Sequence, residues 1–257
     1  MSDRPPVHVD TPAEGVLLVT LDRPEARNAV NSALAEAVAE AMDRLDSDPD
    51  LRVGVITGAN GTFCSGMDLK AFVRGERPYA GGRGFAGLVE RGPEKPLIAA
   101  VEGYALAGGC EIVLACDLVV AGEGAMFGIP EAKRGLVAAG GGLLRLPERI
   151  PYHVAMELAL TGNHMPAQRM AELGLVNRLV PTGGALDAAL ALAAEITANG
   201  PLAVRISKKI VAESLGWPAE EKWARQREVA DPISSSEDAR EGALAFAEKR
   251  APVWRGK

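Results

Sequence analysis

Residues 108–111 read Gly-Gly-Cys-Glu and stand directly before the apolar run Ile-Val-Leu-Ala-Cys, so bare backbone meets a carboxylate where a buried segment begins. If a helix begins at Gly108, its first N–H groups have no acceptor within the helix, and glycine lets a ligand approach them closely. Free N–H groups at the positive end of a helix are what a developing oxyanion requires. The alternative is that both glycines only permit tight packing or a turn.

A second backbone donor is available in the glycine-bearing loop that ends near residue 69. The stretch Phe-Cys-Ser-Gly-Met-Asp-Leu (63–69) offers the amide of Met67, which follows Gly66. Because one donor seldom suffices to hold an oxyanion, the amides of Met67 and Gly108 form a candidate pair. Asp68 in the same loop is more typical of a cap.

Two carboxylates could supply acid–base chemistry. Glu111 falls in the first turn of the expected helix, where the helix dipole favours the anion, while burial against Ile112 and Val113 favours the neutral acid. These opposing effects can leave its pKa near neutrality, as a general acid or base needs. Glu131 follows Pro130 in Phe-Gly-Ile-Pro-Glu-Ala-Lys-Arg-Gly-Leu (127–136), and taken alone it is an ordinary helix-start carboxylate.

Several other chemistries lack their motifs. The sequence contains no GxGxxG after a strand, no GxxxxGK, no HExxH, no CxxC and no GxSxG. His8, His153 and His164 stand apart from any cluster of cysteines or carboxylates, so we expect no metal site. An enzyme with this sequence would work with carboxylates and backbone amides.

The elements that must position these groups follow from the hydrophobic pattern. Residues 15–24, 52–58 and 97–103 read as strands, and apolar residues at helical spacing follow two capping residues, Asn31 and Ser32. Strands and helices keep alternating to residue 180, which predicts an α/β core. From about residue 185 the patterns are helical, with Leu244, Phe246 and Trp254 among the apolar residues of the tail.

Composition narrows the class of protein further. The chain has 257 residues, 47% of them hydrophobic, and a formal net charge of −6, so it has no general attraction for nucleic acid or anionic membranes. Three cysteines are an odd number in a chain that needs no disulfides, which favours a reducing compartment. With no signal-like start and no apolar run of membrane-spanning length, we expect a cytoplasmic protein.

Taken together, these segments resemble the crotonase family, that is, the enoyl-CoA hydratase/isomerase family. The resemblance covers nearly the whole chain, in matching stretches at 23–31, 63–69, 95–111, 127–136, 155–162 and 246–254. It implies a spiral of ββα units over residues 1–195 and a helical C-terminal oligomerisation region over 196–257. It also implies a homotrimer or a dimer of trimers.

The resemblance assigns roles residue by residue. The oxyanion-hole amides fall on Met67 and Gly108, and the two hydratase glutamates fall on Glu111 and Glu131. Positions that match the family's acyl-CoA site are Ala26, Arg27, Met67, Asp68, Leu69, Lys70, Gly108 and Lys249. Coenzyme A would enter as part of the substrate, and no metal or redox cofactor would be needed.

The sequence also departs from the family pattern. Arg27 stands where a leucine is commoner, and Ala-Ala-Gly-Gly-Gly-Leu-Leu-Arg (138–145) replaces the usual Pro-Gly-Ala-Gly-Gly-Thr-Gln-Arg. The second change lies just beyond Glu131 and bears on the shape of the acyl pocket. The activity that the resemblance implies is hydration of a 2-enoyl-CoA. A Δ3-Δ2-enoyl-CoA isomerase and a non-catalytic acyl-CoA-binding protein are the alternatives.

Overall fold

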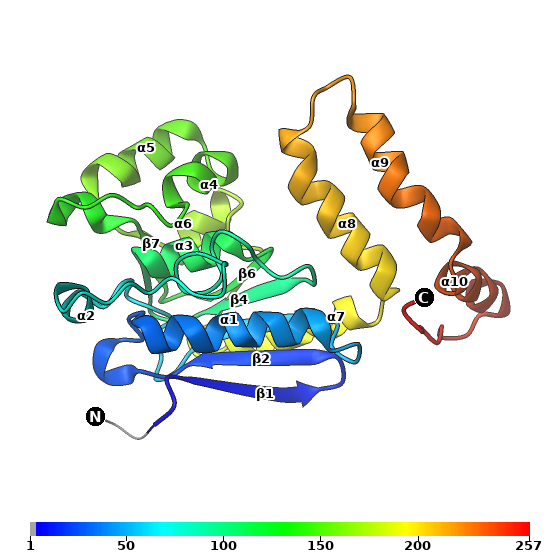
Figure 1. Ribbon diagram of the computed structural model, residues 1–257, viewed down its shortest axis with the longest axis horizontal. Helices are drawn as coiled ribbons and strands as arrows, with labels where there is room; N and C mark the ends of the chain where they lie inside the picture. The colour runs from blue at the N-terminus through cyan, green and yellow to red at the C-terminus, as the bar shows by residue number, and fades with distance from the viewer. Residues whose placement is uncertain (1–3) are drawn as a thin grey trace.

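A computed structural model describes residues 4–257, and its core contains two β-sheets (Figure 1). The larger sheet has six strands in the order β1-β2-β3-β4-β6-β9, and the smaller has three in the order β5-β7-β8. In the larger sheet, β1 and β2 are antiparallel and the other neighbours are parallel. The strands are β1 (Val7–Ala13), β2 (Val16–Leu21), β3 (Val53–Gly58), β4 (Leu97–Val101), β5 (Tyr104–Leu106), β6 (Leu118–Gly122), β7 (Met126–Gly128), β8 (Met165–Pro166) and β9 (Arg178–Val180).

Successive strands enter the two sheets alternately. β4 joins the larger sheet, β5 turns into the smaller one, and helix α3 (Gly108–Ala115) returns the chain to β6. β6 and β7 repeat the pattern, and after β3 an isolated bridge pairs Cys64 with Ala105 of β5. This arrangement is the spiral of ββα units, so the expected fold is confirmed.

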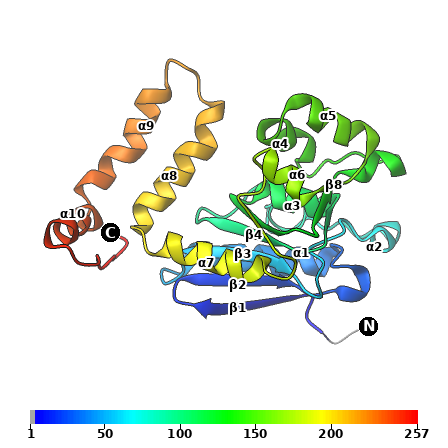
Figure 2. The ribbon, with the colours of Figure 1, turned by 180° about the vertical axis from the view of Figure 1, so that it is seen from behind.

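Helices cover both faces of the larger sheet. On one face lies α1 (Ser32–Ser47), which begins where the Asn31 side chain accepts a hydrogen bond from the Leu34 N–H at 3.0 Å. On the other lies α7 (Ala185–Thr197), whose Ala185, Ala189 and Ala193 are fully buried (Figures 1 and 2). Alanines spaced four apart form one small-residue stripe, which lets this helix pack closely on the strands.

The remaining helices of the core are α2 (Leu69–Val73), α4 (Gly142–Arg149), α5 (Tyr152–Thr161) and α6 (Ala167–Glu172), with two 3-10 helices at Pro24–Ala26 and Pro130–Arg134. α4, α5 and α6 lie with α3 beside the smaller sheet, whereas α2 lies apart from them (Figure 1).

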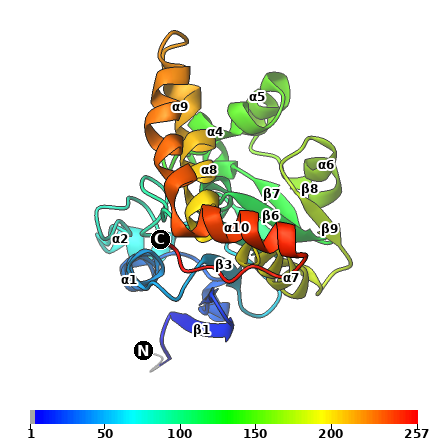
Figure 3. The same ribbon diagram turned by 90° about the vertical axis from the view of Figure 1, so that its right-hand side faces the viewer.

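Three C-terminal helices stand away from the sheets, and the first two run side by side (Figures 1 and 3). They are α8 (Pro201–Glu213), α9 (Lys222–Ala230) and α10 (Glu237–Glu248), with short 3-10 turns at Ser214–Gly216 and Asp231–Ser235. The Lys208 ammonium anchors α8 by an ion pair with Asp117 at 2.7 Å. We call α8–α10 the helical arm. α7 ends at Thr197, so the arm begins close to the boundary predicted between residues 195 and 196. The division of the chain into two regions at that boundary stays a prediction.

The helical arm exposes apolar side chains. Phe246 is 88% exposed and Leu244 is 50% exposed, and Val211, Leu215 and Trp223 are exposed as well. Trp254, which the sequence grouped with them, instead packs on its own chain, because its indole N–H donates to the Ala198 carbonyl at 2.8 Å. Within residues 4–257, none of the helices is both long enough and apolar enough to span a bilayer.

Candidate active site

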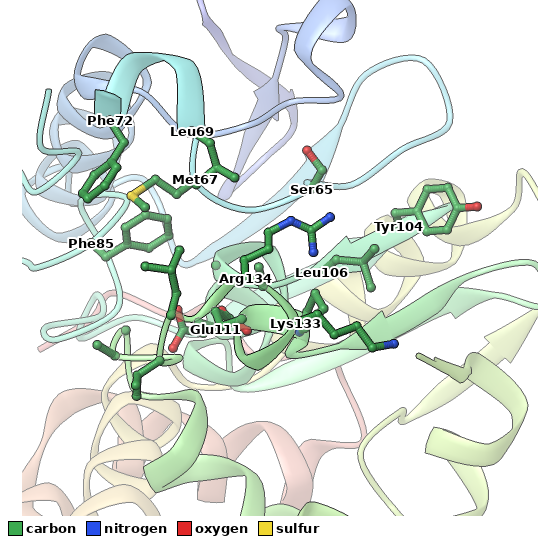
Figure 4. A pocket seen from close by; sticks show the side chains of 18 of the residues that line it. Ser65, Met67, Leu69, Phe72, Phe85, Tyr104, Leu106, Glu111, Lys133 and Arg134 are labelled. Carbon is green, nitrogen blue, oxygen red and sulfur yellow. The ribbon is translucent and has the colours of Figure 1, made fainter. Parts of the chain in front are cut away.

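A cavity of about 650 Å³ opens beside the smaller sheet and contains the candidate catalytic groups. Met67, Gly108, Glu111 and Glu131 all line it, although they come from four separate segments of the chain. Figure 4 shows Met67 and Glu111 facing the same space from the loop before α2 and from α3. The fold therefore brings together the two amides and two carboxylates that the sequence singled out.

The Met67 amide is turned toward the cavity by strand-like pairing with Val30. The Val30 N–H donates to the Gly66 carbonyl at 2.8 Å, and the Asp68 N–H donates to the Val30 carbonyl at 2.9 Å. Because successive residues of an extended segment point their polar groups to opposite sides, the Met67 N–H points away from Val30. In residues 4–257 it has no backbone acceptor, so it is free to donate to a ligand.

The Gly108 amide is presented by a residue with an unusual backbone. Ala107, at the N-cap of α3, has φ 52° and ψ −128°, and its own N–H donates to the Gly128 carbonyl at 2.9 Å. A non-glycine residue with positive φ is strained, and such strain gathers at functional sites. This conformation leaves the Gly108 N–H outside the helix ladder at its positive end.

Glycines allow the two donors to come close. A Cβ on Gly66, whose φ is +103°, would lie 2.6 Å from the Ala107 Cβ and 3.2 Å from the Gly108 nitrogen. A Cβ on Gly108 would lie 2.4 Å from the Phe85 ring. A Cβ on Gly109 would collide with the Cys64 carbonyl, so Gly108 and Gly109 do serve close packing, as the alternative explanation held. The residues that carry the two free N–H groups, Met67 and Gly108, line the same cavity.

Glu111 is buried and held by the start of α4. Its Oε1 accepts a hydrogen bond from the Gly142 N–H at 2.9 Å, and it is 4% exposed. Burial raises the pKa of Glu111, and the N–H groups of Gly142 and Gly140 and the charge of Arg145 oppose that rise. The balance expected from the sequence, burial against favourable dipoles, is therefore present, with burial the larger effect.

Glu131 lies in the 3-10 helix that follows β7, with Pro130 at its first position. Its Oε2 is buried and, among the described residues, has no hydrogen-bond partner. Burial, and secondarily the negative charge of Glu111, raise the pKa of Glu131 to about 7. A carboxyl group with this pKa and an unused oxygen in a cavity is suited to proton transfer near neutral pH.

The walls of the cavity differ in chemistry from one end to the other. Figure 4 shows Phe72, Met67 and Phe85 grouped at one end, Tyr104 and Lys133 at the other, and Arg134 between them. Tyr79 packs edge-on against Phe85, with ring centroids 6.1 Å apart, and extends the apolar end. The site thus offers an apolar compartment and a cationic one within a single cavity.

The residues matched to the acyl-CoA site fall into two groups. Arg27 and Leu69 line the cavity together with Met67 and Gly108. Asp68 caps α2, since its Oδ1 accepts from the Lys70 and Ala71 N–H groups. The positions outside the cavity lining are Ala26, Asp68, Lys70 and Lys249, of which Lys249 is the exposed C-cap of α10 in the helical arm. The roles assigned to these positions stay predictions.

Although partial burial alone would raise the pKa of Asp68, the Ala71 N–H and Arg23 hold it below its usual value. The Arg23 guanidinium lies 2.9 Å from the Asp68 carboxylate. Asp68 is therefore a structural anion that fixes the loop carrying Met67.

Sequence reasoning missed the groups that hold Glu111. The stretch 138–145 was expected to bear on the shape of the acyl pocket, and its three glycines at 140–142 stand at the start of α4, which begins at Gly142. A Cβ on Gly140 would lie 2.6 Å from Glu111 Oε2, so this position must stay bare. The run of glycines at a helix start was the available signal, because such a start also offers free N–H groups to an anion.

The three cysteines lie outside the acid–base pair. Cys64, Cys110 and Cys116 are free and buried, and burial raises the pKa of each thiol, which makes them poor nucleophiles. Among residues 4–257, no three His, Cys, Asp or Glu side chains are grouped so that they could hold a metal ion.

Comparisons with known proteins agree with this geometry. A crystal structure of an enoyl-CoA hydratase from Mycobacterium tuberculosis H37Rv superposes with a TM-score of 0.97 at 59% sequence identity, covering 99% of this chain and 100% of that one. A carnitinyl-CoA hydratase from Mycobacterium avium gives a TM-score of 0.79 at 48% identity, with coverage of 99% and 100%. The architecture is therefore the crotonase fold.

The comparison of sequences identifies the family as well as the fold. The family model described as "Enoyl-CoA hydratase/isomerase" matches residues 11–257, so this chain belongs to the enoyl-CoA hydratase/isomerase family. The enoyl-CoA hydratase EchA19 of Mycobacterium tuberculosis is 45% identical over 94% of this chain and 93% of its own length. The carnitinyl-CoA dehydratase of Salmonella typhi is 44% identical, with coverage of 94% and 95%.

Proposed function

We propose that this chain is a hydro-lyase that adds water to trans-2-enoyl-CoA thioesters and forms 3-hydroxyacyl-CoA thioesters. The observation that carries the proposal is the meeting of two carboxyl groups with raised pKa values, Glu111 and Glu131, in one cavity beside two unbonded backbone amides. Its relatives named enoyl-CoA hydratase support the same reaction.

In the proposed reaction the thioester oxygen accepts hydrogen bonds from the N–H groups of Met67 and Gly108. Glu111 takes a proton from water as the water oxygen attacks C3, and electrons move through C2 to the thioester oxygen. The enolate is stabilised by the two amides, and Glu131 then gives its proton to C2. Proton exchange with solvent restores both carboxyl groups. Since the negative charge rests on the thioester oxygen, this route calls for no metal or redox cofactor.

Replacing each glutamate tests the proposal. Glu111→Gln and Glu131→Gln should each slow hydration of crotonyl-CoA by about 10²–10⁴-fold, followed as loss of the ultraviolet absorbance of the conjugated thioester. The double variant should be little worse than the slower single variant, because groups that act as a unit are not additive.

The same variants separate the alternatives. If Glu111→Gln hydrates normally while Glu131→Gln is inactive, the protein is an isomerase, which shuttles one proton with the carboxylate at position 131. If folded wild-type protein binds CoA thioesters without turning them over, it is an acyl-CoA-binding protein. Either result contradicts the proposed hydratase.

We further propose a homotrimer or a dimer of trimers that works in the cytoplasm, in fatty-acid or related acyl-CoA metabolism. The exposed apolar residues of the helical arm, Leu244 and Phe246 among them, support assembly. The three free buried cysteines support a reducing compartment.

A further inference from the structure

The 3-10 helix that carries Glu131 also carries two cations. Lys133 and Arg134 follow it within the same turn, and both line the cavity together with Arg27 and His164. This cationic end contrasts with the net charge of −6 of the whole chain. A local concentration of positive charge in an acidic protein attracts an anionic group of the ligand.

Of the two cations on this turn, Arg134 is the one without a partner. The Lys133 ammonium donates to the Asn163 Oδ1 at 2.9 Å. Arg134, within the part of the chain that the structure describes, has neither an ion pair nor a side-chain hydrogen bond, and it is an exposed residue that lines the cavity. Figure 4 shows its guanidinium directed across the cavity toward Ser65.

The positive charges in this compartment act on one another. The pKa of His164 lies below its usual value because of partial burial and the charges of Lys133 and Arg134. An arginine cannot give up its proton to relieve such repulsion. An anion from the ligand would relieve it.

We propose that Arg134 binds a phosphate group of the CoA moiety and so anchors the substrate from the same turn that presents the acid Glu131. This inference rests on the proposed function. The guanidinium fork matches the oxygens of a phosphate. The other end of the cavity, with Leu69, Phe72 and Phe85, is apolar and takes the acyl chain, so the anion at the cationic end belongs to CoA.

The assignment adds a binding contact on a wall that the family resemblance left without one. The resemblance placed the CoA contacts at Ala26, Arg27, Lys70 and Lys249, and within this chain only Arg27 of these lines the cavity. Arg134 makes substrate binding and proton donation depend on one short element, because a phosphate held by Arg134 fixes the position of the Glu131 turn relative to the thioester.

Calorimetric titration with CoA and with pantetheine, which lacks the phosphates, tests this proposal without requiring turnover. Arg134→Gln should weaken CoA binding about tenfold, the effect of one charge-assisted hydrogen bond at a partly exposed site, and leave pantetheine binding unchanged. Arg134→Lys should recover part of the loss. Arg44→Gln, which removes the same charge from an exposed position on α1, should change neither affinity.

The other possible results would contradict different parts of the proposal. Equal losses of affinity for CoA and pantetheine, or no loss for either, overturn the role of Arg134 and leave the hydratase proposal standing. If Arg134→Gln instead impairs only thioesters whose acyl chain ends in a carboxylate, Arg134 reads the acyl group and the phosphate assignment is wrong. A folded wild-type protein that binds neither ligand overturns the proposed function and this inference together.

Discussion

At the scale of single residues, Glu131 gives the site its sensitivity to pH. Its pKa of about 7 follows from burial and from the neighbouring Glu111 charge, and the proposed reaction needs Glu131 protonated. The rate constant kcat/KM for crotonyl-CoA should therefore fall as pH rises through about 7, since this parameter reports the free enzyme. Stopped-flow measurement over a range of pH checks this. A flat profile through neutrality contradicts the assignment of Glu131 as the acid.

The raised pKa of Glu131 should also be visible in stability. The folded value of about 7 lies above the ordinary value of about 4.3, so the stabilisation from this group is complete below about pH 4.3 and is lost as pH rises to about 7. Glu131→Gln has no such loss. The difference in Tm, variant minus wild type, should therefore increase across this window in calorimetric scans, and a constant difference would show that Glu131 has an ordinary pKa.

Met67 should matter through its backbone and not through its side chain. Met67→Pro removes the N–H, while the bonds that Gly66 and Asp68 make with Val30 can remain. Losing one oxyanion donor costs about 10²–10³-fold in rate, so Met67→Pro should be slow and Met67→Ala should keep most activity. Steady-state kinetics on both variants, with circular dichroism to confirm folding, decides. Equal and mild effects contradict the oxyanion role.

At the scale of elements, the start of α4 acts as a support for Glu111. Gly140→Ala places a Cβ 2.6 Å from Glu111 Oε2, and the carboxylate must move because the neighbouring Gly142 N–H holds its other oxygen. We expect kcat to fall at least tenfold with little change in KM, since small displacements of a catalytic group are costly.

A matched control separates this effect from a general cost of replacing glycine. A Cβ added to Gly216, in the helical arm, would meet no other atom within 4 Å, so Gly216→Ala should leave kcat unchanged. If Gly140→Ala is as active as Gly216→Ala, Glu111 does not depend on the start of α4.

What the sequence could predict at this scale was local. The cap at Asn31, the helix that begins at Gly108 and the turn before Gly142 follow from residue types within a few positions. The bond between Gly142 and Glu111 joins residues 31 apart, and no local pattern contains it.

The burial and ion pairing of charged side chains were equally hard to predict from the sequence. Arg83 looks like a surface residue, yet it is 2% exposed and paired with Asp43 and Asp46 of α1. Pairings of this kind depend on how distant segments pack, and no local pattern in the sequence contains them.

At the scale of the whole molecule, the core and the helical arm differ in how they bury apolar surface. The sheets and their helices share large clusters of buried apolar residues, whereas α8 and α9 contain no buried residue and α10 buries only Asp238 and Ala245. Exposed apolar surface of this kind marks an interaction site. The arm is therefore the part of the chain whose packing a second copy of the chain would complete.

Light scattering should accordingly give the mass of a trimer or a hexamer, and Phe246→Asp should shift it toward the monomer. Phe246 is 88% exposed within its own chain, so the charge enters no intrachain core and the fold should survive. Phe246→Leu keeps an apolar side chain and should keep the assembly. Deleting residues 235–257 should cost both assembly and CoA affinity, because Lys249 lies in that segment. A stable, fully active wild-type monomer would sink the proposed assembly, since the exposed face of α10 would then serve no contact between subunits.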